Sequence, residues 1–261
     1  MRIDVYGDTL CASVTAGMLA STGHEVRWLV PGGRVWQSLE AGDIAYREPG
    51  LRSLINEQRE AGRLRCCVLN GHGHEPEPAQ VVFLALQPGA LDAAYGIARE
   101  AAADESCRVL VNQSVFPVGT TEELQALLDD MDSCGRVVSL PETLQEGAAL
   151  ESFARPGNIL LGCDDDAAEE LLREILRPFN RRRDVIQVMR PREAEFTKLA
   201  ISGMLATRLS FMNDMALLAE PLGVDIDRVR QGLGADSRIG EAYLYAGCGF
   251  GGPGFSRDVM S

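Results

Sequence analysis

Short apolar strands alternate with helices through the first 190 residues, and this alternation constrains the fold more than any other feature. The segments Arg2–Tyr6, Leu10–Thr22 and His24–Val30 predict a strand, a helix and a strand, a βαβ unit of about 30 residues. Further strands are expected at Val81–Leu86, Arg108–Asn112, Arg136–Leu140, Asn158–Gly162 and Val185–Val188, and helices at Ala90–Ala103, Thr121–Met131 and Ala167–Leu176. This pattern predicts an α/β fold, a Rossmann-like doubly wound parallel sheet covered on both faces.

The segment Arg192–Gly223 predicts the longest helix of the chain. Strong helix formers dominate it and no proline lies between Pro191 and Pro221, so about 30 residues span about 45 Å. Apolar side chains fall on several sides, as in helices that are buried, often between subunits. We therefore expect a Rossmann-like dinucleotide-binding-type domain at residues 1–190 and an α-helical dimerisation domain at 191–261, with a homodimer formed through the long helix.

The long helix contains Lys198, the only lysine among the 25 basic residues. A lysine can lose its proton and act as a compact donor, which an arginine does not readily do. At the helical period, Lys198, Ser202 and Asn213 share one polar stripe. Lys198 is therefore a candidate for chemistry, and a core helix with satisfied polar groups is the competing interpretation.

Composition excludes several kinds of partner. The 25 Lys and Arg residues against 38 Asp and Glu give a formal net charge of -13, which argues against nucleic acid or an anionic membrane. The 7 cysteines show no metal-like spacing, and His72 and His74 in a Gly/Pro loop are weak evidence for a metal, so we expect free thiols and no metal site. No signal-peptide layout opens the chain and no apolar run reaches the ~18 residues of a membrane span. We expect a cytoplasmic protein.

The turn after the first strand is where a sheet of this kind binds a dinucleotide. A GxGxxG turn needs its second glycine so that the backbone can approach the pyrophosphate. Here the three positions are Gly7, Thr9 and Ala12, and Thr9 places a branched side chain at the phosphates. Val30 stands where an acidic residue would hold the ribose hydroxyls. Taken alone, this turn does not predict NAD.

Six segments together resemble the UDP-glucose/GDP-mannose 6-dehydrogenase family in order and spacing over nearly the whole chain. They are Glu48–Leu51, Pro117–Thr121, Pro141–Gly147, the Lys198 helix with Ser210–Asn213, Arg238–Gly240 and Gly249–Gly252. Enzymes of this family oxidise the C6 alcohol of a nucleotide sugar to a carboxylate in two hydride transfers to NAD, through a cysteine-bound thiohemiacetal and thioester. The resemblance therefore implies NAD as cofactor and a nucleotide sugar as ligand.

The resemblance also implies roles for individual residues. Lys198 corresponds to the lysine that stabilises the oxyanion at C6, Glu142 to a glutamate that assists proton movement, and Asp258 to an aspartate that helps activate the hydrolytic water. The residues implied to bind the substrate are Glu146, Arg238, Phe250, Gly251, Gly252 and Arg257, with Arg238 often serving the partner subunit's site. The residues implied to bind the cofactor are Gly7, Thr9, Leu10, Val30, Gln87 and Ser114. Helix capping by Glu142 or Glu146, and pairing of Asp258 with Arg257, are the alternatives.

Departures from the family pattern cluster at the implied active site. Gly254, in FGGPGFSRD, occupies the position of the nucleophilic cysteine, so no thiolate is available there. Val115 replaces the water-positioning threonine, Ser202 replaces an asparagine, and Arg257 replaces a lysine. Gln87 lies where the family's cofactor-contacting GTP would be. These changes predict vestigial catalytic residues and a cofactor site that is weakened or lost.

Three hypotheses follow. The leading one is a catalytically degenerate relative, a pseudoenzyme that binds or regulates in nucleotide-sugar and polysaccharide metabolism, with a nucleotide sugar or an active dehydrogenase as partner. The alternative is an NAD-dependent nucleotide-sugar oxidoreductase with altered chemistry, which stops at the aldehyde or uses another nucleotide sugar, because Lys198 still suits an alkoxide. A purely structural dimerisation partner is the third. Cys248, close before Gly254, is the candidate for a relocated nucleophile.

Overall fold

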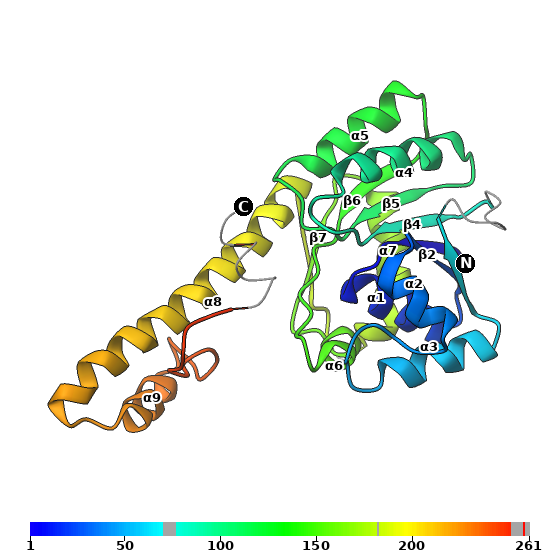
Figure 1. Ribbon diagram of the computed structural model, residues 1–261. Helices are drawn as coiled ribbons and strands as arrows, with labels where there is room; N and C mark the ends of the chain where they lie inside the picture. Colours follow the sequence, from blue (N-terminus) through cyan, green and yellow to red (C-terminus); the bar gives the residue numbers. More distant parts are fainter. Residues whose placement is uncertain (70–76, 182, 252–257, 259–261) are drawn as a thin grey trace. The chain divides into compact units, whose positions relative to one another are not determined.

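The computed structural model describes residues 1–69, 77–181, 183–251 and 258 (Figure 1). These residues divide into two units, Met1–Glu195 and Phe196–Ser261. The first unit is built on a sheet, and the second consists of helices and the segment that follows them.

One eight-stranded sheet forms the centre of the first unit, in the order β3-β2-β1-β4-β5-β6-β7-β8. Its strands are β1 (Arg2–Tyr6), β2 (Glu25–Val30), β3 (Leu64–Val68), β4 (Val81–Leu84), β5 (Val109–Asn112), β6 (Arg136–Ser139), β7 (Ile159–Gly162) and β8 (Ile186–Met189). The predicted doubly wound α/β sheet is confirmed, and every strand predicted from the sequence is present within one or two residues of its expected ends.

The sheet departs from the prediction at one junction. β7 runs antiparallel to β6, with Ser139 opposite Gly162, whereas the other neighbouring strands are parallel. A strand parallel to its predecessor needs a crossover connection that returns the chain to the end of the sheet where the predecessor began. An antiparallel strand does not need one. The segment after β6 contains only the short helix α6 (Ala149–Ala154), so β7 begins at the edge where β6 ends.

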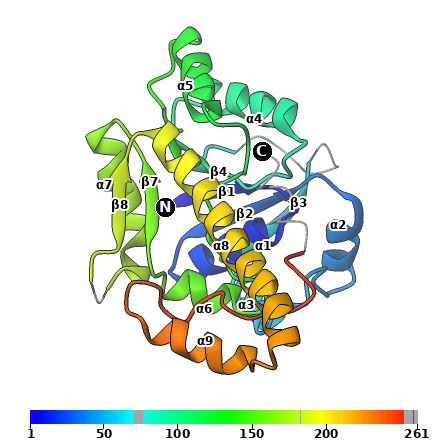
Figure 2. The ribbon, with the colours of Figure 1, turned by 90° about the vertical axis from the view of Figure 1, so that its left-hand side faces the viewer.

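Helices cover both faces of this sheet (Figure 1, Figure 2). On one face α1 (Leu10–Ser21) packs against α3 (Leu51–Glu60) and α6, and on the other α4 (Leu91–Ala103) packs against α5 (Thr120–Asp130). The remaining helices of the unit are α2 (Gly33–Glu40), α7 (Asp166–Leu176) and the 3-10 helix η1 (Arg177–Phe179). No expected element corresponds to α2, α3, β3 or α6, which are short; α2 and α3 are also mostly polar.

The core of this unit lies in two layers, one on each face of the sheet. Alternation along β1 shows the division, because Ile3 and Val5 belong to the cluster under α1 while Tyr6 belongs to the cluster under α4 and α5. Asp4 faces the same side as Tyr6 and is buried, and Arg27 Nε donates to its carboxylate at 2.7 Å. A buried carboxylate is tolerated because it is paired and hydrogen-bonded.

The second unit is dominated by α8 (Pro191–Ala219), a helix of 29 residues that confirms the predicted long helix. The 3-10 helix η2 (Glu220–Leu222) and α9 (Ile226–Ala235) follow it, and Gly223 takes a φ of 65° at the turn between them. Several large apolar side chains of α8 and η2 are exposed in the single chain, namely Phe196, Met204, Phe211, Leu217, Leu218 and Leu222. Contacts among the described residues therefore leave these apolar side chains exposed.

The first turn of α8 is fixed within the first unit. Glu195 is buried, and its carboxylate accepts from the backbone amides of Gly119 at 2.6 Å and Thr121 at 2.9 Å, at the start of α5. A Cβ added to Gly162 would lie 2.6 Å from Pro191 Cα, so glycine is required where the helix meets β7. No described helix is long and apolar enough to cross a membrane.

Candidate functional site

The turn between β1 and α1 lies at the carboxyl end of the central strands. Gly7 has a φ of 136°, and a Cβ added there would lie 2.1 Å from the carbonyl oxygen of Ala85. Trp28 Nε1 donates to the carbonyl oxygen of Gly7 at 2.8 Å, and the Tyr46 hydroxyl donates to that of Asp8. Only glycine permits this close approach between the turn and the end of β4.

Thr9 is the N-cap of α1, and its hydroxyl is bound inside the turn. It accepts from the amide of Ala12 at 3.0 Å and donates to the carbonyl oxygen of Ala85 at 2.8 Å. The side chain thus replaces the flexibility of a second glycine with a rigid cap. Leu10, the other predicted cofactor residue of this turn, is half-buried and begins α1.

The remaining predicted cofactor positions differ in accessibility. Val30 ends β2 and is fully buried in the core. Ser114 is also buried; its hydroxyl donates to the carbonyl oxygen of Leu84 at 3.0 Å and accepts from the amide of Leu86 at 2.9 Å, so it joins the ends of β4 and β5. Gln87 is exposed and donates to Asp8 Oδ1 at 3.3 Å.

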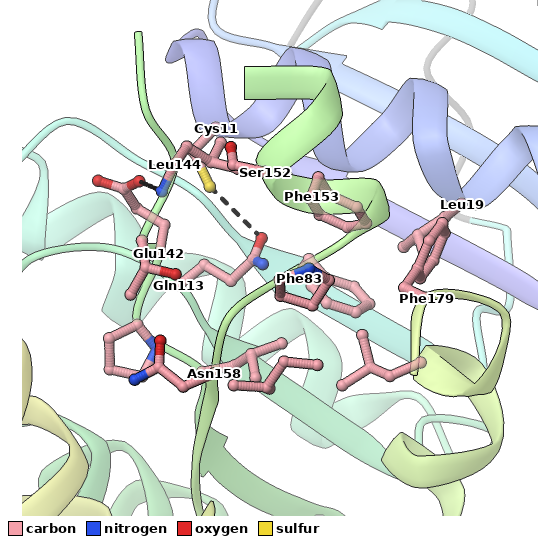
Figure 3. Close-up of a pocket in the computed structure, with 16 residues that line it drawn as sticks. Cys11, Leu19, Phe83, Gln113, Glu142, Leu144, Ser152, Phe153, Asn158 and Phe179 are labelled. Carbon is pink, nitrogen blue, oxygen red and sulfur yellow. Dashed lines mark hydrogen bonds between the residues drawn. The ribbon is translucent and has the colours of Figure 1, made fainter. Parts of the chain in front are cut away.

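A pocket opens beneath the segment that follows β6 (Figure 3). Its empty volume is about 590 Å³, counting the solvent at its mouth. Polar side chains of Cys11, Gln113, Glu142, Ser152 and Asn158 line it together with apolar ones of Leu19, Phe83, Phe153 and Phe179. Pockets with an apolar wall and a few polar groups are typical small-molecule sites.

Gln113 is a site residue that the sequence analysis missed. It is buried, and its Oε1 accepts from Thr15 Oγ1 at 3.0 Å and from Cys11 Sγ at 3.7 Å (Figure 3). These bonds hold the amide against α1, directly after β5. The sequence feature that could have identified Gln113 is its position in the QSVFPVGT segment, directly before the predicted cofactor residue Ser114. Val115, which replaces the family's threonine, is half-buried.

Glu142, predicted to assist proton movement, lines this pocket and accepts from the amide of Leu144 at 3.0 Å. Glu146 is exposed. The carboxylate at the start of α6 is instead that of Glu48, which accepts from the amides of Gly147 at 2.8 Å and Ala149 at 2.6 Å. Glu48 thereby ties the EPGL segment to the PETLQEG segment.

In the second unit, Lys198 is brought together with Asp258 and Ser202. Lys198 Nζ lies 2.7 Å from Asp258 Oδ2, and the Ser202 hydroxyl donates to the same oxygen at 2.8 Å. The two charged side chains are only 12% and 2% exposed. Asp258 is therefore bound by the catalytic candidate Lys198 and by Ser202. Asn213, the third residue of the predicted polar stripe, accepts instead from the amide of Gly247 at 2.7 Å.

The other predicted substrate residues are exposed where the structure describes them. Arg238 is 87% exposed and pairs with Asp236 at 2.7 Å, and this hydrogen bond raises the pKa of the guanidinium. Arg208 holds the same segment, donating to the carbonyl oxygens of Ile239 and Gly240 at 3.0 and 2.9 Å. Phe250 is 37% exposed and Gly251 is exposed. Gly252, Gly254 and Arg257 lie outside the described residues.

The thiols and histidines add no metal site within the described part of the chain. No group of three or more His, Cys, Asp or Glu residues there is arranged to hold a metal, and His72 and His74 lie outside it. All 7 cysteines are free thiols. Burial raises the pKa of Cys66 to about 11 and of Cys107 to about 12, which keeps both thiols protonated at neutral pH. Cys248 is exposed.

These features define a class of protein. A parallel sheet with β1 between β2 and β4, and a glycine-requiring turn leading into α1 at the carboxyl edge, is a dinucleotide-binding α/β domain. Gly7 lets the turn lie against the end of β4, and the N-terminus of α1 then stands at the carboxyl edge of the sheet, where this fold binds a dinucleotide. The ribose position has no carboxylate, since Val30 is packed in the core.

Comparison with known proteins gives the family. Residues 1–180 match the NAD binding domain of the UDP-glucose/GDP-mannose dehydrogenase family, and residues 192–261 match its central domain. The chain belongs to the UDP-glucose/GDP-mannose dehydrogenase family.

Individual relatives agree with this assignment. The UDP-glucose 6-dehydrogenase of Pseudomonas aeruginosa is 37% identical over 276 residues, which cover 100% of this chain and 60% of the relative. The enzyme of the same name from Rhizobium meliloti is 32% identical, covering 100% of this chain and 62% of the relative. A UDP-glucose dehydrogenase structure from Pyrobaculum islandicum superposes with a TM-score of 0.85 at 31% identity, over 98% of this chain and 62% of that chain. This chain thus spans about 60% of the length of its relatives.

Proposed function

We propose that this chain provides the dinucleotide-binding and oxyanion-stabilising parts of a nucleotide-sugar oxidoreductase. The proposed enzyme oxidises an alcohol group of the sugar to an aldehyde. The observation that carries the proposal is the nearly buried cluster of Lys198, Asp258 and Ser202. An ammonium held in a largely water-excluded position stabilises a developing alkoxide far better than one in bulk water. The family membership and the glycine turn at Gly7 support the dinucleotide half of the proposal.

The proposed step is a two-electron oxidation. The hydroxyl oxygen of the sugar loses its proton to a base, and the carbon loses a hydride. An oxidised nicotinamide dinucleotide supplies the hydride acceptor when bound. Lys198 holds the oxygen as it becomes an alkoxide and then a carbonyl. None of these events needs a thiolate, so Gly254 does not prevent them.

The aldehyde is the expected product because of Gly254. In the family, the second oxidation passes through an adduct with the cysteine that Gly254 replaces. Without a thiol adduct, the carbonyl has no covalent route to the thioester and then to the carboxylate. Nucleotide sugars are the proposed substrates, in the wider context of polysaccharide synthesis.

Turnover of nucleotide sugars tests this proposal directly. The protein is incubated with UDP-glucose, UDP-N-acetyl sugars or GDP-mannose and an oxidised dinucleotide, while reduced nicotinamide is followed by absorbance and the product is identified by mass spectrometry. We expect an aldehyde, and a loss of about 100-fold or more in kcat for Lys198→Ala. Arg228→Ala, on the exposed surface of α9, is the matched control and should retain full activity. A carboxylate product, or no turnover, contradicts the proposal.

A second function is favoured by one observation, the glycine at position 254 in place of the nucleophile. Under this proposal the chain is a pseudoenzyme that binds a nucleotide sugar, or an active dehydrogenase, for regulation. A ligand that binds only the native state raises the melting temperature. Thermal stabilisation by a nucleotide sugar without turnover supports this function over catalysis. Absence of both effects leaves only the structural dimerisation role.

We also propose self-association through α8 and η2. The exposed fractions of Phe196, Met204, Leu217 and Leu222 are 63%, 63%, 70% and 75%, and a helix apolar on several sides is stable in water only when another surface covers it. Sedimentation velocity should show a dimer. Met204→Glu with Leu217→Glu should shift it to monomer, and Val118→Glu in the first unit should not. The free thiols further support a cytoplasmic location, which cell fractionation tests.

A further inference from the structure

The carboxyl end of β2 has an unusual chemical character for an NAD site. The strand ends at the fully buried Val30, and Pro31, Gly32 and Gly33 lead to Arg34 in the first turn of α2. In dinucleotide-binding α/β domains an acidic residue near this position binds the adenosine ribose hydroxyls and disfavours a 2′-phosphate, whereas a nearby arginine accommodates that phosphate. This segment has lost the carboxylate and carries the arginine.

Arg34 is connected to the dinucleotide turn by two hydrogen bonds. Its guanidinium donates to the carbonyl oxygen of Ala45 at 3.1 Å. The next residue, Tyr46, donates its hydroxyl to the carbonyl oxygen of Asp8, between Gly7 and Thr9. The 43–49 loop therefore spans from Arg34 to the turn where the pyrophosphate of a dinucleotide binds. A ribose attached to that pyrophosphate reaches the carboxyl end of β2 in this fold.

A basic pocket lies at the same place. It is lined by Arg34, Ser38, Asp43, Tyr46, Arg47, Glu48 and Arg52, among others, and has an empty volume of about 930 Å³ including open solvent. It therefore contains three guanidinium groups and two carboxylates.

Both carboxylates of this pocket are engaged. Asp43 Oδ1 lies 3.6 Å from Arg52 Nε and accepts from the amide of Ile44 at 2.9 Å. Glu48 accepts from the amides of Gly147 and Ala149. The balance of charge is positive in a chain whose formal net charge is -13, so the pocket is a local exception to the acidic surface.

We propose that this pocket takes the 2′-phosphate of a dinucleotide, so that the chain prefers NADP(H) to NAD(H). The inference rests on the dinucleotide binding in the proposed function and specifies its cofactor. Arg34 uses one donor on Ala45, and a guanidinium has five donors, so a phosphate oxygen can be bound by the same side chain. The Ser38 hydroxyl is a second donor on the same helix, and Arg47 adds charge.

Calorimetry with NADPH, NADH, adenosine 2′,5′-bisphosphate, AMP and inorganic phosphate tests this preference without requiring turnover. We expect NADPH to bind about 10-fold more tightly than NADH or better, which corresponds to about 1.4 kcal/mol, and the bisphosphate to bind more tightly than AMP. Arg34→Ala should reduce the ratio of the NADPH affinity to the NADH affinity to about 1, with the NADH affinity unchanged. Arg34→Lys should keep part of the preference for NADPH. Ser38→Asp should weaken the binding of NADPH about 10-fold, because the new carboxylate repels the 2′-phosphate. Arg99→Ala, on the exposed side of α4, is the control and should change nothing.

The outcomes separate this inference from the function on which it rests. NADH binding as tightly as NADPH, or more tightly, overturns the 2′-phosphate site and leaves the proposed oxidoreductase standing. Binding of neither dinucleotide overturns both. A preference for NADPH that survives Arg34→Ala and Ser38→Asp overturns the assignment to this pocket. Equal responses to the bisphosphate and to inorganic phosphate would show a general anion site and would also overturn it.

Discussion

The two units of the chain differ in how far their large apolar side chains are buried. The first unit places its large apolar residues in two buried clusters on the faces of the sheet. In the second, the buried apolar residues of the described part are Ala206, Met212, Ala219 and Leu244, while long side chains of α8 and η2 remain exposed. The sheet unit therefore buries its own apolar core, whereas the exposed apolar side chains of the helical unit are the basis of the self-association proposed above.

The units also use their polar groups differently. Around the sheet, the side chains of Thr9, Ser114, Glu48 and Glu195 bind backbone amides or carbonyls and so fix the shape of the carboxyl edge. In the helical unit, Lys198 and Asp258 form a charged pair between side chains. The carboxyl edge of the sheet is thus held by bonds between side chains and backbone, whereas the candidate site of the second unit is held by two opposite charges.

The largest expected effect is on the shape of the carboxyl edge. Gly7→Ala places a Cβ at 2.1 Å from the Ala85 carbonyl oxygen at a φ of 136°, so we expect a loss of about 3 kcal/mol or more in the free energy of unfolding. Urea denaturation followed by Trp28 fluorescence measures it. Gly96→Ala, within α4 and without neighbours in the way, is the control and should stabilise by about 0.5–1 kcal/mol. Equal effects of the two changes would contradict the requirement for glycine.

The contrast in apolar burial gives the next effect. Leu124 of α5 is fully buried, and Leu124→Ala should cost about 2–5 kcal/mol. Leu217 is 70% exposed, and Leu217→Ala should change the stability of the monomer by about 0.5 kcal/mol or less. Denaturation at low protein concentration measures both. A cost for Leu217→Ala that grows with protein concentration would show that a second copy covers this side chain.

A smaller effect is expected at the charged pair. Asp258→Asn leaves the 12% exposed ammonium of Lys198 without its carboxylate, and should destabilise the second unit by about 1–3 kcal/mol. Because Lys198 is the only lysine, the α-amino group of Met1 is the other amine that an amine-reactive ester modifies, and peptide mass spectrometry separates the two sites. Labelling should increase several-fold in the variant. Asp227→Asn, in an exposed pair with Arg230, is the control, and unchanged labelling of Lys198 in Asp258→Asn would contradict the pairing.

The smallest effect concerns pH. Asp165 caps α7, and the hydrogen bond from the Ala168 amide, with further help from Arg136, lowers the pKa of its carboxyl below 3.8. The contribution of the Asp165 carboxylate to the free energy of unfolding is therefore complete above the ordinary pKa of an aspartate. It is lost as the pH falls through the lowered pKa. Asp165→Ala should cost about 1 kcal/mol at neutral pH and less in acid. Urea denaturation at neutral and acidic pH checks this, and Asp165→Asn should keep most of the cap; a cost independent of pH would contradict it.

The sequence predicted the elements with strong local signals. β1, α1 and β2 have continuous apolar runs of the right length, and α8 has good helix formers between two prolines, so their limits agree closely with expectation. The short α2 and α3, which are mostly polar, and the half-buried β3 lack such a signal. The antiparallel β7 depends on how the chain returns after β6, which no local pattern encodes.

The site was predictable only in part. The resemblance to a family brought attention to Lys198 and Asp258, whose side chains are in contact across 60 positions of sequence. The roles of Glu48 and Glu195 depend on backbone amides that are 101 and 74 positions away. A glutamate that binds distant amides looks the same in sequence as one in solvent. Gln113 was missed for the same reason.

The position of β1 also has a consequence for synthesis on the ribosome. One edge of β1 pairs with β2, which ends at Val30, and the other pairs with β4, which begins only at Val81. At ~5–20 residues per second, about 3–10 s separate the emergence of these two neighbours. During that interval the central strand of the sheet has one unpaired edge, the kind of edge that invites association between nascent chains. Slower translation prolongs this exposure, so the yield of folded protein is expected to depend on chaperones that cover the first half of the chain.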